Sequence, residues 1–192
     1  MSDGSTMLSA PERFETERLV LRRPVMADAQ AMFEGYSRNA EVTRYLQFRP
    51  HTDVAETRLF IRRCAGVWRR GTSFPWVITL RSSGDLVGAI EMRPHAEASH
   101  RVEVGYVLAQ RHWGHGYMPE ALRAITDWAL EQPSIYRVEA ECDLENVRSA
   151  RVMEKAGFER EGILRRWMVF PNRSDEPRDV VRYSRVRPEA GR

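Results

Sequence analysis

Cysteine, lysine and long apolar runs are all scarce in this chain of 192 residues. Its two cysteines, Cys64 and Cys142, stand far apart, so the sequence predicts neither a disulfide framework nor a metal site, and we expect two reduced thiols. No segment approaches the roughly 20 apolar residues of a membrane-spanning helix, which argues against a membrane partner. The first six residues lack the basic start and apolar core of a signal peptide, so we expect a cytoplasmic location.

Positive charge is present but modest, with a formal net charge of +3 and Lys155 as the only lysine among 30 basic residues. Such a balance fits a small polyanionic ligand better than a nucleic-acid surface, so nucleic acid is not an expected partner. The cluster Arg62, Arg63, Arg69 and Arg70 could form a basic patch, but charge runs of this kind are typical of solvated helix faces.

The hydrophobic patterning predicts one mixed α/β domain. We expect strands at residues 17–23, 76–80, 86–92, 101–108, 135–142, 158–170 and 180–186. We expect helices at residues 28–36, 39–46, 53–71, 119–131 and 146–156. The domain is expected to span residues 15–186, after a flexible segment at 1–14 and before a tail at 187–192.

The most informative segment is residues 102–118, where an apolar β-branched run leads through a polar turn to Gly114 and Gly116. A helical pattern opens directly afterwards, at Pro119. The unpaired amides of a first helical turn and the positive end of the helix dipole attract anions, and glycines let the backbone approach them closely. This segment therefore predicts a site for a phosphate-bearing cofactor.

Three segments resemble the GNAT N-acetyltransferase superfamily, in particular its RimJ/RimL-like branch: residues 15–22, 105–122 and 146–158. The resemblance spans about residues 15–186. It implies a single domain with a twisted, mostly antiparallel central sheet, one splayed pair of parallel strands and helices on both faces. It also implies acetyl-CoA as the cosubstrate and no metal.

In that family the pantetheine arm of CoA lies between the splayed strands, here 105–108 and 136–140. The resemblance places it against Tyr106, Val107 and Leu108. It places the pyrophosphate on the turn made by Trp113, Gly114, His115, Gly116, Tyr117 and Met118. The family's phosphate pattern falls on Trp113, Gly116 and Met118; the alternative register beginning at Arg111 lies too near the strand.

Asn146 is expected to reach the pantetheine arm, although an ordinary helix N-cap explains the same residue. His112 and His115 could touch phosphate, against the simpler interpretation as turn residues. Many relatives carry a tyrosine where this chain has Met153, so Ser149 is our candidate donor to the departing thiolate. Its alternative is a helix-surface hydroxyl bonded locally.

For the remaining chemistry, the backbone N–H of Leu108 is the expected oxyanion donor. Glu103 is the first candidate for the general base, against the interpretation as an exposed strand position, and Glu91 is the second. Cys142 could suggest a covalent acyl-enzyme, but its apolar strand favours a core thiol.

The resemblance predicts direct acetyl transfer to a primary amine, most simply the N-terminal α-amine of a protein. An α-amine has a pKa near 8 and lysine near 10.4, so neutralising lysine near pH 7.5 costs roughly 3 to 4 kcal/mol more. A site without an obvious dedicated base suits the easier amine. A small-molecule amine such as a polyamine or antibiotic, and a CoA-binding sensor without turnover, remain alternatives, and a homodimer is left open.

Overall fold

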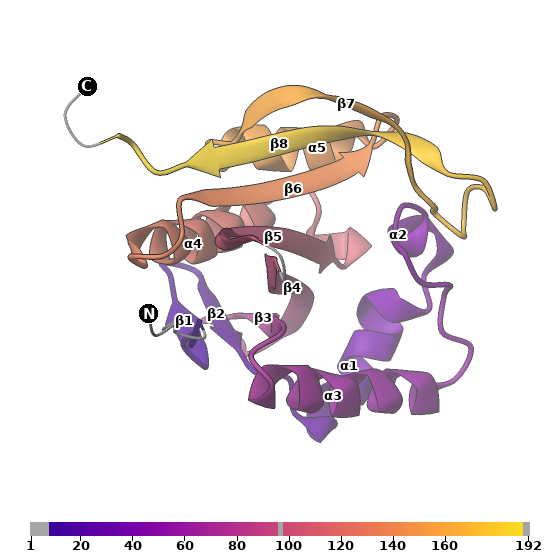
Figure 1. Cartoon of the computed structure of the whole chain (residues 1–192). Coiled ribbons are helices and arrows are strands. Elements are labelled where there is room, and N and C mark those ends of the chain that lie inside the picture. Colours follow the sequence, from indigo (N-terminus) through magenta and orange to yellow (C-terminus); the bar gives the residue numbers. More distant parts are fainter. Residues whose placement is uncertain (1–7, 96–97, 190–192) are drawn as a thin grey trace.

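A single eight-stranded sheet organises the protein, and the computed structural model describes residues 8–95 and 98–189 of it (Figure 1). The strands are β1 (Arg13–Glu15), β2 (Leu19–Arg22), β3 (Phe74–Leu80), β4 (Leu86–His95), β5 (Ala98–Leu108), β6 (Arg137–Asp143), β7 (Glu159–Met168) and β8 (Arg178–Val186). Their order is β1-β2-β3-β4-β5-β6-β8-β7. The pair β5–β6 is parallel and the other neighbouring pairs are antiparallel, which confirms the predicted mixed sheet.

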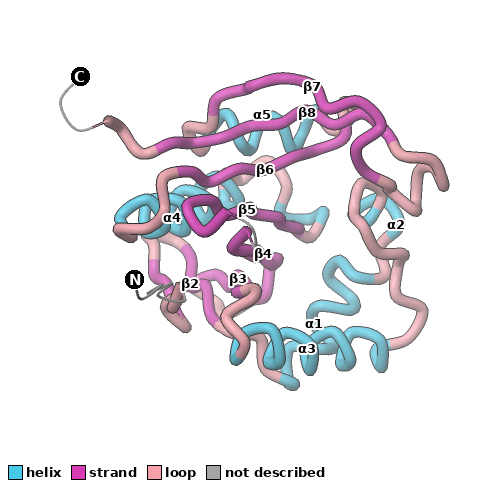
Figure 2. Tube along the Cα trace, in the orientation of Figure 1, coloured by secondary structure: helices cyan, strands magenta, loops and turns pink. Residues whose placement is uncertain are grey.

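Helices pack on both faces of the sheet, as predicted (Figures 1 and 2). They are α1 (Ala29–Met32), α2 (Ala40–Thr43), α3 (Val54–Arg69), α4 (Tyr117–Glu131) and α5 (Val147–Lys155). Met32 of α1 and Ile61 of α3 pack with Val77 of β3 in one hydrophobic cluster. The larger cluster on the other face holds the apolar side of α4, together with Met153 of α5. None of the helices in the described residues is long and apolar enough to cross a membrane.

Two local signals in the sequence act as predicted. The α3 helix begins with the capping box formed by Asp53 and Glu56, in which each side chain accepts from the other residue's backbone. Gly84, with φ of 77°, lies in the turn between β3 and β4. The predicted helix at 28–36 differs, because the chain forms a 3-10 turn at Met26–Asp28, then α1, then a π-helical turn at Phe33–Ser37.

The N-terminal segment is more ordered than predicted. Residues 13–15 pair with 20–22 as an edge strand, and the Trp76 indole donates to the Pro11 carbonyl at 2.9 Å. Phe14 packs edge-on against Trp76 and Trp128, with ring centroids 5.4 and 5.9 Å away. Residues 11–15 are therefore paired and packed against the body of the protein, where the sequence led us to expect a flexible segment at 1–14. Residues 1–7 lie outside the described residues. The strand has only one apolar residue between charged neighbours, so it shows no periodicity.

The C-terminal tail begins later than predicted. Arg187, assigned to the tail, donates its Nε to the Leu130 carbonyl at 2.8 Å and its backbone amide to Tyr136 at 2.9 Å. It therefore belongs to the folded body. Residues 190–192 lie outside the described residues.

The parallel strands β5 and β6 separate after only three pairs. Arg101, Val102 and Glu103 pair with Arg137, Val138 and Glu139. Beyond this point β5 continues for five residues to Leu108 and β6 for four to Asp143 without pairing to each other. The splayed pair expected from the sequence is thus present, and it positions the site.

Candidate active site

The edge of β5 that faces the splay offers backbone groups to an added chain. On the other edge, the Ala109 amide donates to Val87 at 2.8 Å and the Val107 carbonyl lies against Gly88, where an added Cβ would come within 2.3 Å of it. Because successive residues present their backbone groups to opposite edges, Tyr106 and Leu108 face β6, with which they do not pair. An extended, amide-bearing ligand could pair there like a strand. The backbone of Val107 faces β4, so its predicted contact with the cofactor would have to come from its side chain and stays a prediction.

The glycine turn that follows has the backbone of an anion site. Gly114 and Gly116 have φ of 83° and 78°, and Gly116 is the N-cap of α4 without a side-chain cap. Within the described part of the chain, the backbone amides of residues 114–118 donate to no backbone carbonyl. Met118 buries its side chain in the core at 2% exposure, so only its amide is presented. This is the strand, turn and helix start that the sequence predicted.

A partly buried clamp that the sequence did not reveal holds this turn. The Glu120 carboxylate accepts from the Thr16 hydroxyl at 2.5 Å and the Arg18 amide at 2.9 Å, and Arg18 Nε reaches its other oxygen at 2.7 Å. Arg18 also donates to the His115 carbonyl at 2.9 Å. Burial alone would raise the pKa of Glu120, but the hydrogen bonds from Thr16 and Arg18 outweigh it and lower the pKa. The clamp therefore stays charged and places the Arg18 cation beside the predicted phosphate site.

Trp113 supports the turn through its side chain. Its indole N–H donates to the Leu108 carbonyl at 2.8 Å, and the Arg148 guanidinium lies 4.6 Å from its ring centroid. This bond ties the turn to the end of β5 and leaves the Leu108 amide directed at the splay. The Trp113 side chain therefore braces the turn, and a contact between Trp113 and the cofactor stays a prediction.

The two histidines of the turn are placed differently from one another. His115 stacks on Tyr117, with ring centroids 5.6 Å apart and planes 8° apart. Burial, followed by the neighbouring Arg111, lowers the pKa of His112. His112 is therefore neutral near pH 7 and brings no positive charge to a phosphate.

On the α5 side of the splay, Ser149 sits in a small polar cluster. Its hydroxyl lies 2.8 Å from the Tyr106 hydroxyl, and its amide donates to the Asn146 side chain at 3.3 Å. Asn146 is thus an N-cap, and a contact with the cofactor through its remaining side-chain nitrogen stays a prediction. Met153 is fully buried and its thioether carries no proton to donate. Burial raises the pKa of Cys142 to about 12, in keeping with a core thiol.

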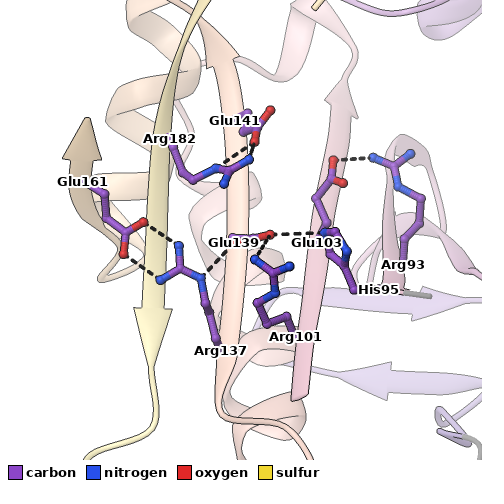
Figure 3. Close-up of polar contacts among 9 residues, drawn as sticks. All are labelled: Arg93, His95, Arg101, Glu103, Arg137, Glu139, Glu141, Glu161 and Arg182. Atoms are coloured by element: carbon purple, nitrogen blue, oxygen red, sulfur yellow. Dashed lines mark hydrogen bonds and ion pairs between the residues drawn. The ribbon is translucent and has the colours of Figure 1, made fainter. Parts of the chain in front are cut away.

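A cavity of about 400 Å³ opens on the other face, where β5 and β6 separate (Figure 3). It is lined by Gln47, Arg93, His95, Arg101, Glu103, Glu139, Glu141, Trp167, Met168 and Arg182. Glu103, the predicted base, lies opposite Glu139 at the last paired position of the two strands. The structure therefore brings Glu103 to the splay, as its proposed role requires.

Each carboxylate of this cavity has an arginine partner. Arg93 Nη2 lies 2.7 Å from Glu103, and Arg182 donates to Glu141. Glu139 is held by Arg137 at 2.7 Å, with His95 at 3.4 Å and Arg101 at 3.9 Å from its other oxygen (Figure 3). Glu91, the second candidate base, accepts from Ser73 and from Arg93.

Sequence reasoning missed Glu139 and Glu141. The signal was present, because these acids alternate with Val138, Ala140 and Cys142 along β6. Alternation places the acids on one face of the sheet and the apolar residues on the other.

Known proteins resemble most of the chain. The family model for the acetyltransferase (GNAT) domain matches residues 18–159. YoaA of Bacillus subtilis (strain 168), named as an uncharacterized N-acetyltransferase, is 30% identical over 174 residues, covering 91% of this chain and 96% of that protein. A GNAT-family acetyltransferase from Bacillus anthracis superposes with a TM-score of 0.78 at 27% identity, covering 91% and 98% of the two chains. RimL, a ribosomal L7/L12 α-N-protein acetyltransferase in complex with CoA, gives 0.79 at 21% identity, with 91% and 98% covered.

Proposed function

Since this chain belongs to the GNAT acetyltransferase family and is an N-acetyltransferase that uses acetyl-CoA, we propose that it transfers the acetyl group directly to an N-terminal α-amine of a protein. One observation carries the proposal: the splay between β5 and β6 has an unpaired backbone edge leading to the glycine turn, and a charged cavity where the strands meet. Acetyl-CoA and the acceptor amine would thus approach the splay between β5 and β6 from two sides.

The residues around the splay fit the cofactor. The free edge of β5 at Tyr106 can pair with the amides of the pantetheine arm, and the amides of 114–118 can receive the pyrophosphate. Trp113 and the clamp formed by Thr16, Arg18 and Glu120 hold these amides in place. When bound, acetyl-CoA supplies a thioester, an acyl group already activated for attack by an amine.

Three residues of the chain then serve the transfer. The Leu108 amide stabilises the negative charge that develops on the carbonyl oxygen. Glu103, at the last paired position before β5 and β6 separate, accepts the proton of the attacking amine, directly or through water. Ser149, on the α5 side of the splay, donates a hydrogen bond to the departing thiolate.

The charge of the cavity supports an α-amine as the acceptor. Its lining holds three glutamates, three arginines and one histidine. A polyamine or aminoglycoside would be bound best by an excess of acidic groups, which this lining does not provide. Each of its glutamates also has an arginine partner, so no unpaired carboxylate stands ready as a strong base. An acceptor with a pKa near 8 needs the least help.

The test is release of free CoA thiol in the presence of acceptor panels. Peptides with a free N-terminus should turn over, whereas the same peptides with a blocked N-terminus and an internal lysine, and polyamines or aminoglycosides, should turn over far more slowly. Faster turnover of the blocked lysine peptide or of a small amine would overturn the proposal of an N-terminal α-amine as the acceptor. CoA binding without turnover of any acceptor would favour the alternative function of a non-catalytic CoA-binding sensor.

Two substitutions test the assigned roles. Glu103→Gln and Ser149→Ala should each lower turnover by about tenfold or more, with little change in CoA affinity by calorimetry. Glu159→Gln on β7, which is exposed, is the matched control and should behave as the parent protein. Unchanged turnover in either test variant would remove that residue from the mechanism.

A further inference from the structure

Arg101 is the arginine of the charged cavity that has no carboxylate of its own. Each glutamate of the lining accepts a hydrogen bond from a different arginine; the pairs are Glu103 with Arg93, Glu139 with Arg137, and Glu141 with Arg182. Arg137 is not part of the lining, so its bond to Glu139 leaves one lining arginine over. Arg101 Nη1 lies 3.9 Å from Glu139, which is beyond hydrogen-bond length (Figure 3).

The donors of Arg101 are unused within the part of the chain that the structure describes. Its Nε is buried and has no hydrogen-bond partner there. A buried donor without an acceptor destabilises the protein, and more so on a charged group. The side chain as a whole keeps 31% exposure and lines the cavity, so a ligand oxygen can reach it. A ligand in the cavity could therefore supply the missing acceptor.

The charges around Arg101 favour a ligand group with a single negative charge. The paired arginines and glutamates of the lining leave one unmatched guanidinium, which one carboxylate would balance. A phosphate dianion would bring a second negative charge close to Glu103 and Glu139, and a second amine would meet a cation of its own sign. The planar fork of N–H groups on arginine also matches the two oxygens of a carboxylate.

The position of Arg101 relative to Glu103 indicates where this carboxylate would lie on the acceptor. The two residues are two positions apart on β5, so they share the cavity face with Cα atoms about 7 Å apart. An extended peptide covers the same distance in two residues. With its α-amine at Glu103, an acceptor can therefore place a side chain of its first or second residue at Arg101.

We propose that Arg101 determines acceptor specificity by binding a carboxylate on the side chain of the acceptor's first or second residue. This inference rests on the proposed function, in which Glu103 meets the acceptor amine. Acidic N-termini are then the favoured acceptors. The carboxylate makes and breaks no covalent bond, and its contact with Arg101 is the same before and during acetyl transfer. Its loss should therefore raise KM and leave kcat nearly unchanged.

The first test compares pairs of acceptor peptides on the parent protein, with rates from the release of CoA thiol. The peptides have a free N-terminus and an amidated C-terminus, so the side chain under test is their only carboxylate. Aspartate at the first or second position should give a kcat/KM about tenfold above that of asparagine at the same position, because a charge-assisted pair is stronger than a neutral one. Equal kcat/KM for acid and amide at both positions would overturn the inference.

The second test changes Arg101 itself. Arg101→Gln should raise the KM of the preferred aspartate peptide about tenfold and leave its kcat and the KM of the asparagine peptide near their parent values. Arg101→Lys keeps the charge without the fork and should retain part of the preference. Arg62→Gln is the matched control, since this arginine is exposed on α3 and its loss removes the same charge away from the cavity.

A purely structural role for Arg101 predicts a different result. Arg101→Gln would then slow the aspartate and asparagine peptides alike, and this outcome would overturn the inference. If Arg101→Gln does not fold, the parent panel and Arg101→Lys still decide it.

The inference and the proposed function fail in distinguishable ways. Turnover of free N-termini without any preference for aspartate would refute the inference alone. No turnover of any peptide would refute the proposed function, while calorimetry of the aspartate and asparagine peptides in the presence of CoA would still test the carboxylate contact. Free aspartate turned over faster than every peptide would refute the protein acceptor and keep Arg101 as the partner of a carboxylate.

Discussion

Gly114→Ala tests the backbone conformation of the glycine turn without disturbing the neighbouring side chains. Gly114 has φ of 83°, and an added Cβ would meet nothing within 4 Å. The substitution therefore adds no clash, only the cost of a left-handed alanine, roughly 1–2 kcal/mol. If the turn keeps its shape, this cost lowers the free energy of unfolding. If the turn relaxes, CoA binding must restore it, and affinity falls by about 5- to 30-fold.

Gly84→Ala is the matched control. Gly84 has φ of 77°, also with nothing within 4 Å, but it lies in the turn between β3 and β4. Calorimetry with CoA and thermal unfolding should be measured on both variants. We expect a lower Tm by about 2–8 °C in Gly84→Ala with unchanged CoA affinity. Gly114→Ala should weaken CoA, and Gly114→Asn should recover part of the loss, since asparagine tolerates this conformation.

Two results would refute the reasoning. CoA affinity that is unchanged in Gly114→Ala, together with unchanged stability, would mean that the turn does not need its left-handed residue. Equal loss of affinity in the two alanine variants would mean that the effect is general destabilisation and that the turn is not the phosphate site.

Three further predictions follow from individual contacts. Trp113→Phe removes the donor to the Leu108 carbonyl and should lower the free energy of unfolding by about 1 kcal/mol in denaturant titrations, with CoA affinity reduced several-fold; unaltered affinity would contradict the bracing role. Hydrogen bonds from Arg137 lower the pKa of Glu161 to about 2, so this pair stabilises the fold above about pH 4.5 and the gain is lost as pH falls toward 2; Glu161→Gln should flatten the acid limb of a pH–stability profile, and an unchanged limb would refute it. Burial raises the pKa of both cysteines to about 12, so a thiol reagent at pH 8 should label the native protein only slowly and both thiols at once in denaturant; prompt labelling would show an accessible thiol.

Elements with strong local patterns could be predicted from the sequence. The long helices α3 and α4, the strands of the central sheet and the glycine turn all carry periodicity, caps or positive-φ glycines within a few residues of themselves. Local chemistry suffices there because the hydrogen bonds that close these elements are themselves local.

Contacts between distant segments could not be predicted in this way. Arg18 and Glu120 are 102 residues apart, and nothing beside either one announces the other. The same holds for residues 10–14, which are ordered by Trp76 and Trp128 from two other parts of the chain. Tertiary partners decide these features, and a single sequence shows periodicity but not partners.

The division of the site between two faces follows from strand alternation. Along β5 and β6 the side chains of Glu103, Glu139 and Glu141 share one face, and those of Tyr106 and Cys142 share the other. A shift of either strand by one residue would exchange the faces, moving charged groups into the main core and the tyrosine into the cavity. The buried apolar residues Val102, Val104 and Val138 prevent that shift, because they are held at or below 3% exposure. The register that builds the core therefore also places the charged cavity and the side chains of Tyr106 and Cys142 on opposite faces of the sheet.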